Sequence, residues 1–505
     1  MTAKIIIMVI FFGVTAGIGI YCRRHATNVG DFVLGGRNVG PWLTAFSYGT
    51  SYFSAVVFIG YAGQFGWSYG ISSTWVGLGN AFIGSMMAWM ILGRRTRIMT
   101  KHFESATMPD FFARRYGCQR LKTAASVIIF VFLIPYSASV YKGLSGLFSM
   151  AFDLDFTLCI IAMAVLTAVY VIAGGYMAAA VNDLIQGFIM LGGIVLVVWS
   201  VLEGRGGFSA ALEQLSHIPS ELAPAMDGAL VSFFGPDPVN LLGVVLLTSL
   251  GTWGLPQMVH KFYTIKNEES IKAGTVISTL FALVIAGGSY FMGGFGRLYY
   301  TPGADGKVAF DSIVPQMLGA CMPDILIGVV VILVLSASMS TLSSLVITSS
   351  STFTLDFVRT YCKDLSAKGL MLIIRVMCGF FVLLSVLLAL NPGSLITTLM
   401  SLSWGALAGA FLGPFLYGLF WKGATRASVW ASFAASILIT GGNYLLEWVS
   451  PINAGALAIL ASLAVVPLVS LVTPKLSQGH IDDCFACYNE PAVVSTKTAL
   501  PEKSK

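Results

Sequence analysis

The run VLSASMSTLSSLVITSSS at residues 334–351 begins as an apolar segment and then fills with hydroxyls and small side chains. In a helix, residues three or four positions apart lie on the same face, and here these residues are Ser340, Ser343, Ser344 and Ile347. Hydroxyl oxygens are hard, neutral ligands that suit a partly dehydrated alkali cation. Serine and threonine in membrane helices also permit close packing and bond to the preceding turn. The run therefore predicts a polar helix in apolar surroundings, and both an ion site and close packing explain it.

The composition of the chain determines its broad class. Of 505 residues, 56% are hydrophobic and only 10% are charged, whereas a soluble protein carries about 25% charged residues. We therefore expect an integral membrane protein with many spans, which excludes soluble enzymes and nucleic-acid-binding proteins. The net charge of +6 then reflects membrane topology. The eight cysteines are scattered and predict no disulfide framework.

Thirteen apolar runs are long enough to cross a bilayer, which takes about 20 residues. The first lacks a cleavage site and is predicted to be retained. In chain order they are Ile5–Cys22, Pro41–Gly66, Tyr69–Gly93, Thr123–Met150, Phe156–Ala173, Tyr176–Val201, Val239–His260, Thr275–Gly296, Pro323–Ser349, Leu370–Leu390, Ser394–Trp421, Ala427–Leu446 and Ala454–Val472. The sequence thus predicts an all-α polytopic membrane protein.

The charges of the loops predict the topology. Residues 94–122 hold eight basic and two acidic residues, whereas residues 202–238 hold five acidic residues and one arginine. Cytoplasmic loops are rich in lysine and arginine. With thirteen spans, every basic loop falls on one side and the acidic loop on the other. We therefore expect the N-terminus outside the cell membrane and the C-terminus in the cytoplasm.

Two spans carry signs of a broken helix. Glycines and a cluster of hydroxyls interrupt Pro41–Gly66, and Gly251, Gly254 and Pro256 interrupt Val239–His260. Unwound backbone at membrane depth is tolerated where it lines a cavity or is buried in protein, although the small residues also suit close packing. The second break follows the first by five spans and runs in the opposite direction, which indicates an inverted repeat.

The repeat divides the chain into six parts. Residues 41–201 form the first repeat and 239–421 the second, separated by an extracellular loop at 202–238. A peripheral helix and a cytoplasmic loop occupy 1–40, two further peripheral helices occupy 422–472, and a cytoplasmic tail occupies 473–505.

Two of the charged residues within spans, Lys142 and Asp183, are functional candidates. Lys142, in the outer half of the fourth span, either pairs with a substrate carboxylate or extends to the outer interface. Asp183 lies about two turns into the sixth span with no lysine or arginine nearby on its face. This favours a bound cation, or else a hydrogen-bond network. Its depth matches that of Ser343 and Ser344.

Four stretches carry a resemblance to a known family: FVLGGRNVGPWLTAFS (32–47), GGYMAAAVNDLIQGFIM (174–190), PQMVHKFYTIKNEESIKAG (256–274) and ASMSTLSS (337–344). Over residues 31–423 the chain resembles the sodium:solute symporter family, which includes sodium/proline, sodium/pantothenate, sodium/sialic acid and sodium/glucose transporters. The resemblance implies a LeuT-type fold with a five-plus-five inverted repeat, and Na⁺ as the coupling ion.

The resemblance also implies binding residues. A first sodium is expected to bind backbone carbonyls and two hydroxyls, which fall on Thr50, Phe53, Ala337, Ser340 and Thr341. A second sodium, present in some members, would be held by Asp183, Ser340, Ser343 and Ser344. The solute is expected to contact Ser54, Val57, Tyr136, Trp253 and Gln257. Trp253 and Gln257 also flank the second predicted helix break, where aromatic residues often only pack.

The chain departs from the family pattern at three positions. Tyr52 stands where the proline transporters carry an aspartate, which indicates a solute other than proline. Lys261 stands where an arginine is common. Lys142 has no counterpart in the proline or pantothenate branches. Lys142 favours a small carboxylate or another organic anion as the solute.

We therefore expect a sodium-coupled symporter that imports a small organic solute by alternating access. A proton-coupled permease with Asp183 as the carrier and a transporter-like solute sensor remain alternatives. An enzyme is not expected, because no nucleophile–base pair or metal cluster is visible at membrane depth. The expected partners are the solute, sodium ions and the lipid bilayer, with no nucleic acid and no obligate protein partner.

Overall fold

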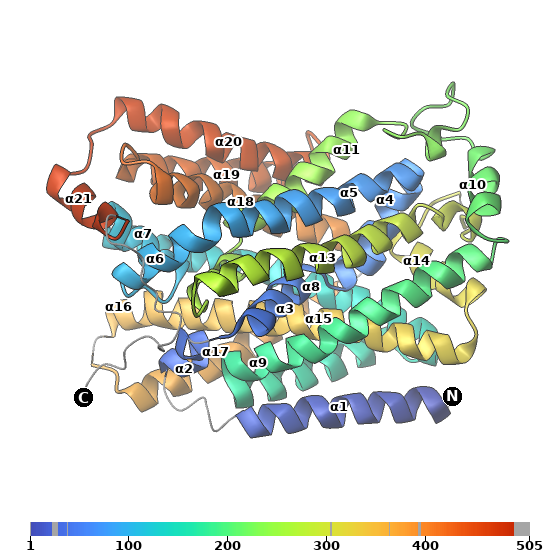
Figure 1. The fold of residues 1–505 in the computed structure, drawn as a ribbon, viewed down its shortest axis with the longest axis horizontal. Helices are drawn as coiled ribbons and strands as arrows, with labels where there is room; N and C mark the ends of the chain where they lie inside the picture. Colours follow the sequence, from blue (N-terminus) through green and yellow to red (C-terminus); the bar gives the residue numbers. More distant parts are fainter. Residues whose placement is uncertain are drawn as a thin grey trace.

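The computed structural model describes residues 2–22, 29–37, 39–303, 306–362, 364–391 and 395–488. Within these residues the chain is a bundle of helices without a β-strand, and only an isolated bridge pairs Val39 with Ile265. Most of the long helices run side by side along the longest axis of the molecule (Figure 1). The helical fold predicted from the composition is confirmed.

A helix covers each of the thirteen apolar runs. The elements are α1 (Thr2–Cys22), α3 (Pro41–Tyr52) with α4 (Ala62–Tyr69), α5 (Thr74–Gly79) continuing to α6 (Arg94–His102), α8 (Gln119–Phe152), α9 (Phe156–Glu203), α11 (Pro238–Val245) with α12 (Pro256–Tyr263), α13 (Glu268–Gly293), α15 (Asp324–Thr352), α17 (Ala367–Ala389), α18 (Ile396–Phe420), α19 (Arg426–Leu446) and α20 (Pro451–Val472).

By length and apolar character, nine helices in the described part of the chain can cross a membrane, or ten if a bent pair counts as one span. Two shorter apolar helices, Met8–Cys22 and Phe156–Val169, add to these. The protein is therefore a multi-pass membrane protein, and the count of thirteen spans stays a prediction.

Polar side chains begin many of the helices. The carboxylate of Asp155 accepts a hydrogen bond from the backbone N–H of Leu158 at the start of α9, and Thr425 caps α19 at Ser428 in the same way. These side chains satisfy N–H groups that have no partner within the helix. The charged and polar loop residues therefore fix where the apolar helices start.

Helix α15, which contains the hydroxyl-rich run, lies at the centre of the bundle. In its most apolar 18 residues, 83% are buried, against 39% in α17. It packs against α3, α8, α9 and α17. Several hydroxyls bond to the preceding turn, as Ser338 Oγ does to the Val334 carbonyl (2.7 Å). The run thus places many small polar groups deep in the protein.

Both predicted helix breaks are present. Helix α3 ends at Tyr52, the backbone is extended at Phe53 (φ −111°, ψ 118°), and helical structure resumes at Val56. The second break is at Leu255 (φ −78°, ψ 122°), and the segments Pro238–Gly254 and Pro256–Tyr263 meet at 45°. Pro256 is the first residue of α12, a position that needs no N–H donor. The bounds of the two repeats stay a prediction.

The basic loops gather at one end of the bundle. Arg97 donates to the Ile265 carbonyl (2.6 Å), Arg115 to the Gly418 carbonyl (2.8 Å), and Arg426 to the Tyr116 carbonyl (2.7 Å). In Figure 1 this end also holds α7 (Met108–Tyr116) and α21 (Gln478–Ala486), whereas α10 (Phe208–Ser216) of the acidic loop and the start of α1 lie at the opposite end. The side of the membrane that each end faces stays a prediction.

Gly175 interrupts α9 between its two apolar segments. Its backbone (φ 60°, ψ −157°) is in a region that side chains rarely adopt, and an added Cβ would lie 2.7 Å from Cδ2 of Phe32. We expect Gly175→Ala to lower the free energy of unfolding by about 1–3 kcal/mol. Thermal unfolding in detergent measures it. Gly192→Ala, on the same helix with open space around it, is the control, and equal effects of the two substitutions would contradict the prediction.

Candidate functional site

The break in α3 lies against the middle of α15. The backbone N–H of Ala55, just after the break, donates to Ser338 Oγ (3.2 Å). Ser51 Oγ, just before the break, lies 2.7 Å from Ser344 Oγ. Residues far apart in the sequence are therefore joined here through hydroxyls and unwound backbone, deep in the bundle.

Four of the five residues expected for the first sodium converge at this junction. Ser340 Oγ donates to the carbonyls of Ala337 (2.9 Å) and Thr50 (3.0 Å). Thr341 Oγ1 donates to the same two carbonyls, at 3.1 and 3.3 Å. Phe53 lies three residues beyond Thr50, on the extended backbone of the break. Carbonyl and hydroxyl oxygens suit an alkali cation, and a hydroxyl rotates to present its lone pairs. The residues therefore fit a sodium ion.

The surroundings of Asp183 differ from the sequence-based expectation, because a lysine from another helix reaches this carboxylate. Lys261, on α12, places its Nζ 4.0 Å from Asp183 Oδ2, and both side chains are almost fully buried. The same Nζ donates to Ser47 Oγ (2.7 Å) and Ser344 Oγ (3.0 Å). Ser47 Oγ in turn donates to Asp183 Oδ2 (2.5 Å). The sequence shows no basic residue near Asp183 on its own helix, but the folded protein brings Lys261 next to it from α12.

The residues expected for the second sodium are only partly brought together. Asp183 and Ser344 both face the Lys261 ammonium. Ser343 Oγ instead donates to the Ser340 carbonyl (2.8 Å), and Ser340 Oγ belongs to the junction with Thr50. The ammonium, Asp183 and the serines Ser47 and Ser344 together form what we call the lysine site.

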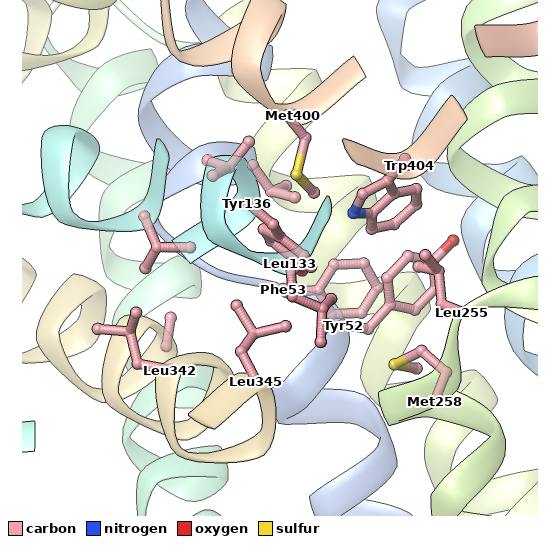
Figure 2. Close-up of a cluster of buried hydrophobic side chains, with 14 of the residues drawn as sticks. Tyr52, Phe53, Leu133, Tyr136, Leu255, Met258, Leu342, Leu345, Met400 and Trp404 are labelled. Carbon is pink, nitrogen blue, oxygen red and sulfur yellow. The ribbon is translucent and has the colours of Figure 1, made fainter. Parts of the chain in front are cut away.

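An aromatic cluster lies beside the break in α3 (Figure 2). The ring of Tyr52 stacks on that of Phe53, with centroids 4.3 Å apart, and lies 6.0 Å from Trp404. Tyr136 of α8 meets Trp404 of α18 edge to face at 5.9 Å. Leucine and methionine side chains from α8, α12, α15 and α18 surround the rings in Figure 2. The cluster joins elements of both predicted repeats.

Several buried polar atoms around this cluster have no hydrogen-bond partner among the described residues. They include the hydroxyl of Tyr136, the indole nitrogen of Trp404 and both amide atoms of Gln257. Gln257 lies between Leu255 and Met258, which both reach the cluster in Figure 2. Buried polar groups nearly always have a partner. Tyr136 and Trp404 are close enough to interact with each other, so the amide of Gln257 is the clearest candidate for a hydrogen bond to a bound molecule.

The other predicted solute contacts lie in different surroundings. Ser54 and Val57 are buried at the break, and Ser54 Oγ accepts from the N–H of Val56. The indole N–H of Trp253 donates to the Ile83 carbonyl (3.0 Å), and the side chain is largely buried. The indole N–H of Trp253 is therefore already paired, unlike the polar atoms of Gln257.

Lys142 lies outside the aromatic cluster. It is six residues beyond Tyr136 on α8, a rise of roughly 9 Å. Its Nζ donates to the Asn391 carbonyl (2.5 Å), and it lines a cavity of about 600 Å³ together with Asp311 and Ile396. Lys142 is buried and ten residues before the end of α8, and both roles expected for it stay predictions.

Sequence reasoning missed the partners of Asp183. In the sequence, Lys261 is only a departure from the family pattern, and Ser47 is one of several hydroxyls within Pro41–Gly66. Lys261 directly follows the predicted span Val239–His260, and the local sequence does not mark Asp183 as its partner.

Comparisons with known proteins agree with the helical fold. The model of the sodium:solute symporter family matches residues 32–435. The osmoregulated proline transporter OpuE of Bacillus subtilis is 29% identical over 460 residues, covering 89% of each chain. The sodium/proline symporter of Salmonella typhimurium is 28% identical over 441 residues, covering 85% of this chain and 84% of the relative. A Na⁺-coupled sialic acid symporter structure matches 94% of this chain and 99% of its own, with 16% identity and a TM-score of 0.74.

Proposed function

The chain belongs to the sodium:solute symporter family, and we propose that it imports a small organic solute together with sodium through the junction of α3 and α15. It is a multi-pass membrane transporter with a LeuT-type fold, it uses Na⁺, and it is not an enzyme. The solute, the binding residues and the orientation, with the N-terminus outside the cell membrane, are part of the proposal.

The main support for sodium coupling at this junction is the group of carbonyl and hydroxyl oxygens that meet at the break in α3. Sodium bound by Thr50, Phe53, Ala337, Ser340 and Thr341 would hold the unwound backbone of α3 against α15. The aromatic cluster begins at the same break, at Tyr52 and Phe53. Ordering of the break by sodium therefore also orders the residues proposed to bind the solute. Each ligand stabilises the state that binds the other, which is the condition for coupling.

The driving force follows from the charge of the ion. One sodium ion that moves inward through 100 mV contributes about 2.3 kcal/mol from the potential alone. Two ions would contribute roughly twice that amount. The number of sodium ions per cycle therefore determines how steep a solute gradient the protein can hold.

The unpaired polar groups favour a solute that carries a hydrogen-bond acceptor. Tyr136 and Trp404 offer a hydroxyl and an indole N–H next to apolar rings, and the buried Gln257 of α12 offers an amide NH₂. We propose a small molecule with an apolar part and a carboxylate or similar group. The proposal rests on these neutral donors, because Lys142 bonds to the Asn391 carbonyl instead. At the position where the proline transporters carry an aspartate, this chain has Tyr52, whose ring stacks on that of Phe53. This difference supports a solute other than proline.

The test starts with thermal unfolding of the purified protein in sodium and in potassium at equal ionic strength. A ligand at about 100 times its dissociation constant stabilises the folded state by roughly 2.7 kcal/mol, so we expect a sodium-specific rise in Tm. Small carboxylates and proline are then added in sodium, and compounds that raise Tm further are tested for uptake into proteoliposomes. Uptake that follows pH and ignores sodium would favour a proton-coupled permease. Solute binding without accumulation would favour a sensor.

Gln257 provides a test of the solute site. We expect Gln257→Met to weaken solute binding about 3- to 10-fold, because one hydrogen bond contributes about 0.5–1.5 kcal/mol. Stability without solute should be unchanged or higher, since the variant removes buried polar atoms that have no partner among the described residues. The measurement is the solute dependence of sodium-driven uptake. Gln214→Met, at an exposed position of α10, is the control. Unchanged solute affinity would contradict the role of Gln257.

A further inference from the structure

The ammonium of Lys261 lies in an environment suited to a monovalent cation. Its Nζ donates to two serine hydroxyls and lies 4.0 Å from the Asp183 carboxylate. The ring of Tyr176 faces it at 5.1 Å, a distance at which a ring attracts a cation. One carboxylate, neutral hydroxyls and an aromatic face surround one positive charge. The lysine site is therefore neutral overall, counting Asp183 and Lys261.

The lysine site draws its groups from four helices. Lys261 comes from α12, Asp183 from α9, Ser47 from α3 and Ser344 from α15. Helices α3 and α12 are the segments on which the two breaks fall. The ammonium thus links both broken spans to the central helix, as a bound metal ion at this position would do.

The lysine site is also connected to the first sodium site. Ser344 Oγ accepts from Lys261 and lies 2.7 Å from Ser51 Oγ. The carbonyl of Ser51 accepts from Thr341 Oγ1 (3.4 Å), a residue of the first sodium site. The hydroxyls of Ser344 and Ser51 therefore connect Lys261 to the first sodium site.

A second sodium ion does not fit beside the ammonium. Asp183 is the only acidic side chain in the lysine site, and the ammonium already balances it. Two unit charges about 4 Å apart in protein surroundings repel each other enough to weaken binding about a thousandfold. Ser343, a further expected ligand, points its hydroxyl to the Ser340 carbonyl instead. Residues that resemble a second sodium site are thus arranged around a side-chain cation.

We propose that Lys261 is a built-in cation that takes the place of a second sodium ion, so that this transporter binds and moves a single sodium ion per cycle. The inference rests on the proposed function for the identity of the first site. It makes Lys261 the residue that determines the ion stoichiometry, and hence the steepness of the solute gradient that the protein can hold.

The experiment counts the sodium ions bound to purified full-length protein by equilibrium dialysis with radioactive Na⁺. We expect the wild type to bind one ion. Lys261→Ala opens space next to an unpaired carboxylate, and we expect it to bind two, with a Hill slope that rises from about 1 toward 2. Asp183→Asn/Lys261→Ala removes the carboxylate and should bind one ion again. Lys422→Ala, at an exposed lysine paired with Asp482, is the control and should bind one.

The outcomes separate this inference from the proposed function. Two ions in the wild type, or no additional ion in Lys261→Ala, would overturn the role of Lys261. No ion in the wild type but one in Lys261→Ala would support the role of Lys261 and overturn the proposed first sodium site. No ion in either protein would overturn both.

Folding of the variant provides a second measurement. Lys261→Ala leaves a buried carboxylate that needs a cation, so its Tm should rise more in sodium relative to potassium than that of the wild type. The double variant with Asp183→Asn should lose this additional rise. If Lys261→Ala is folded only in sodium, the inference is supported. If it fails to fold in both cations while the double variant folds, sodium does not replace the ammonium and the inference is overturned.

Discussion

Replacement of both hydroxyls at the first sodium site, in Ser340→Ala/Thr341→Ala, is expected to abolish the sodium-specific rise in Tm. Both hydroxyls lie within hydrogen-bond distance of the Thr50 and Ala337 carbonyls, at the point where an ion would join α3 to α15. A hydrogen bond to a charged group contributes about 1.5–3 kcal/mol. Each single substitution should therefore raise the sodium concentration for half-maximal uptake about 10-fold or more.

The control for this prediction is on the same helix. Ser349 is buried, and its hydroxyl has no hydrogen-bond partner among the described residues. Ser349→Ala therefore tests the loss of a hydroxyl from α15 away from the junction, and sodium dependence should be unchanged. If Ser340→Ala and Thr341→Ala also leave sodium dependence unchanged, the ion does not bind at this junction.

The largest expected effect on stability is that of Asp183→Asn. This substitution leaves the Lys261 ammonium buried without its carboxylate, and removal of one partner from a buried ion pair costs about 3–5 kcal/mol. Ser47 and Ser344 keep their hydrogen bonds to Nζ but carry no charge. We expect a much lower Tm and a poor yield of folded protein.

Removal of both charges should restore most of the lost stability. In Asp183→Asn/Lys261→Met no buried charge remains, and an apolar side chain of similar length fills the space of the lysine. Thermal unfolding of the wild type, both single variants and the double variant gives the coupling energy of the pair. Additive effects of the two substitutions would show that Asp183 and Lys261 do not interact as the structure has them.

Much of the site was predictable because it depends on short-range patterns. The break in α3 follows from glycines and hydroxyls within one span, and the break before Pro256 follows from a proline that cannot continue a helix. Ser340 and Thr341 follow from a hydroxyl-rich run in apolar surroundings. Their pairing with the Thr50 carbonyl came from the family resemblance, which carries information on contacts that no single run contains.

Two other candidate residues make contacts with distant segments that the sequence does not indicate. Lys142 has the sequence context of a solute contact, but its Nζ reaches the Asn391 carbonyl, 249 residues along the chain. Trp253 flanks a break, yet its N–H bonds to the Ile83 carbonyl. Neither partner is marked in the sequence, since any backbone carbonyl near a helix end or a break can accept a hydrogen bond.

The membrane class, the helical fold, the two breaks and the hydroxyls that suit sodium could all be predicted from the sequence. These follow from apolar length, residue composition and local backbone preferences, which act within a few turns. The contact between Lys261 and Asp183, in contrast, is visible only in the folded protein. Which side chain reaches a buried carboxylate depends on how α3, α9, α12 and α15 rotate and cross, and the packing of all four helices sets those angles.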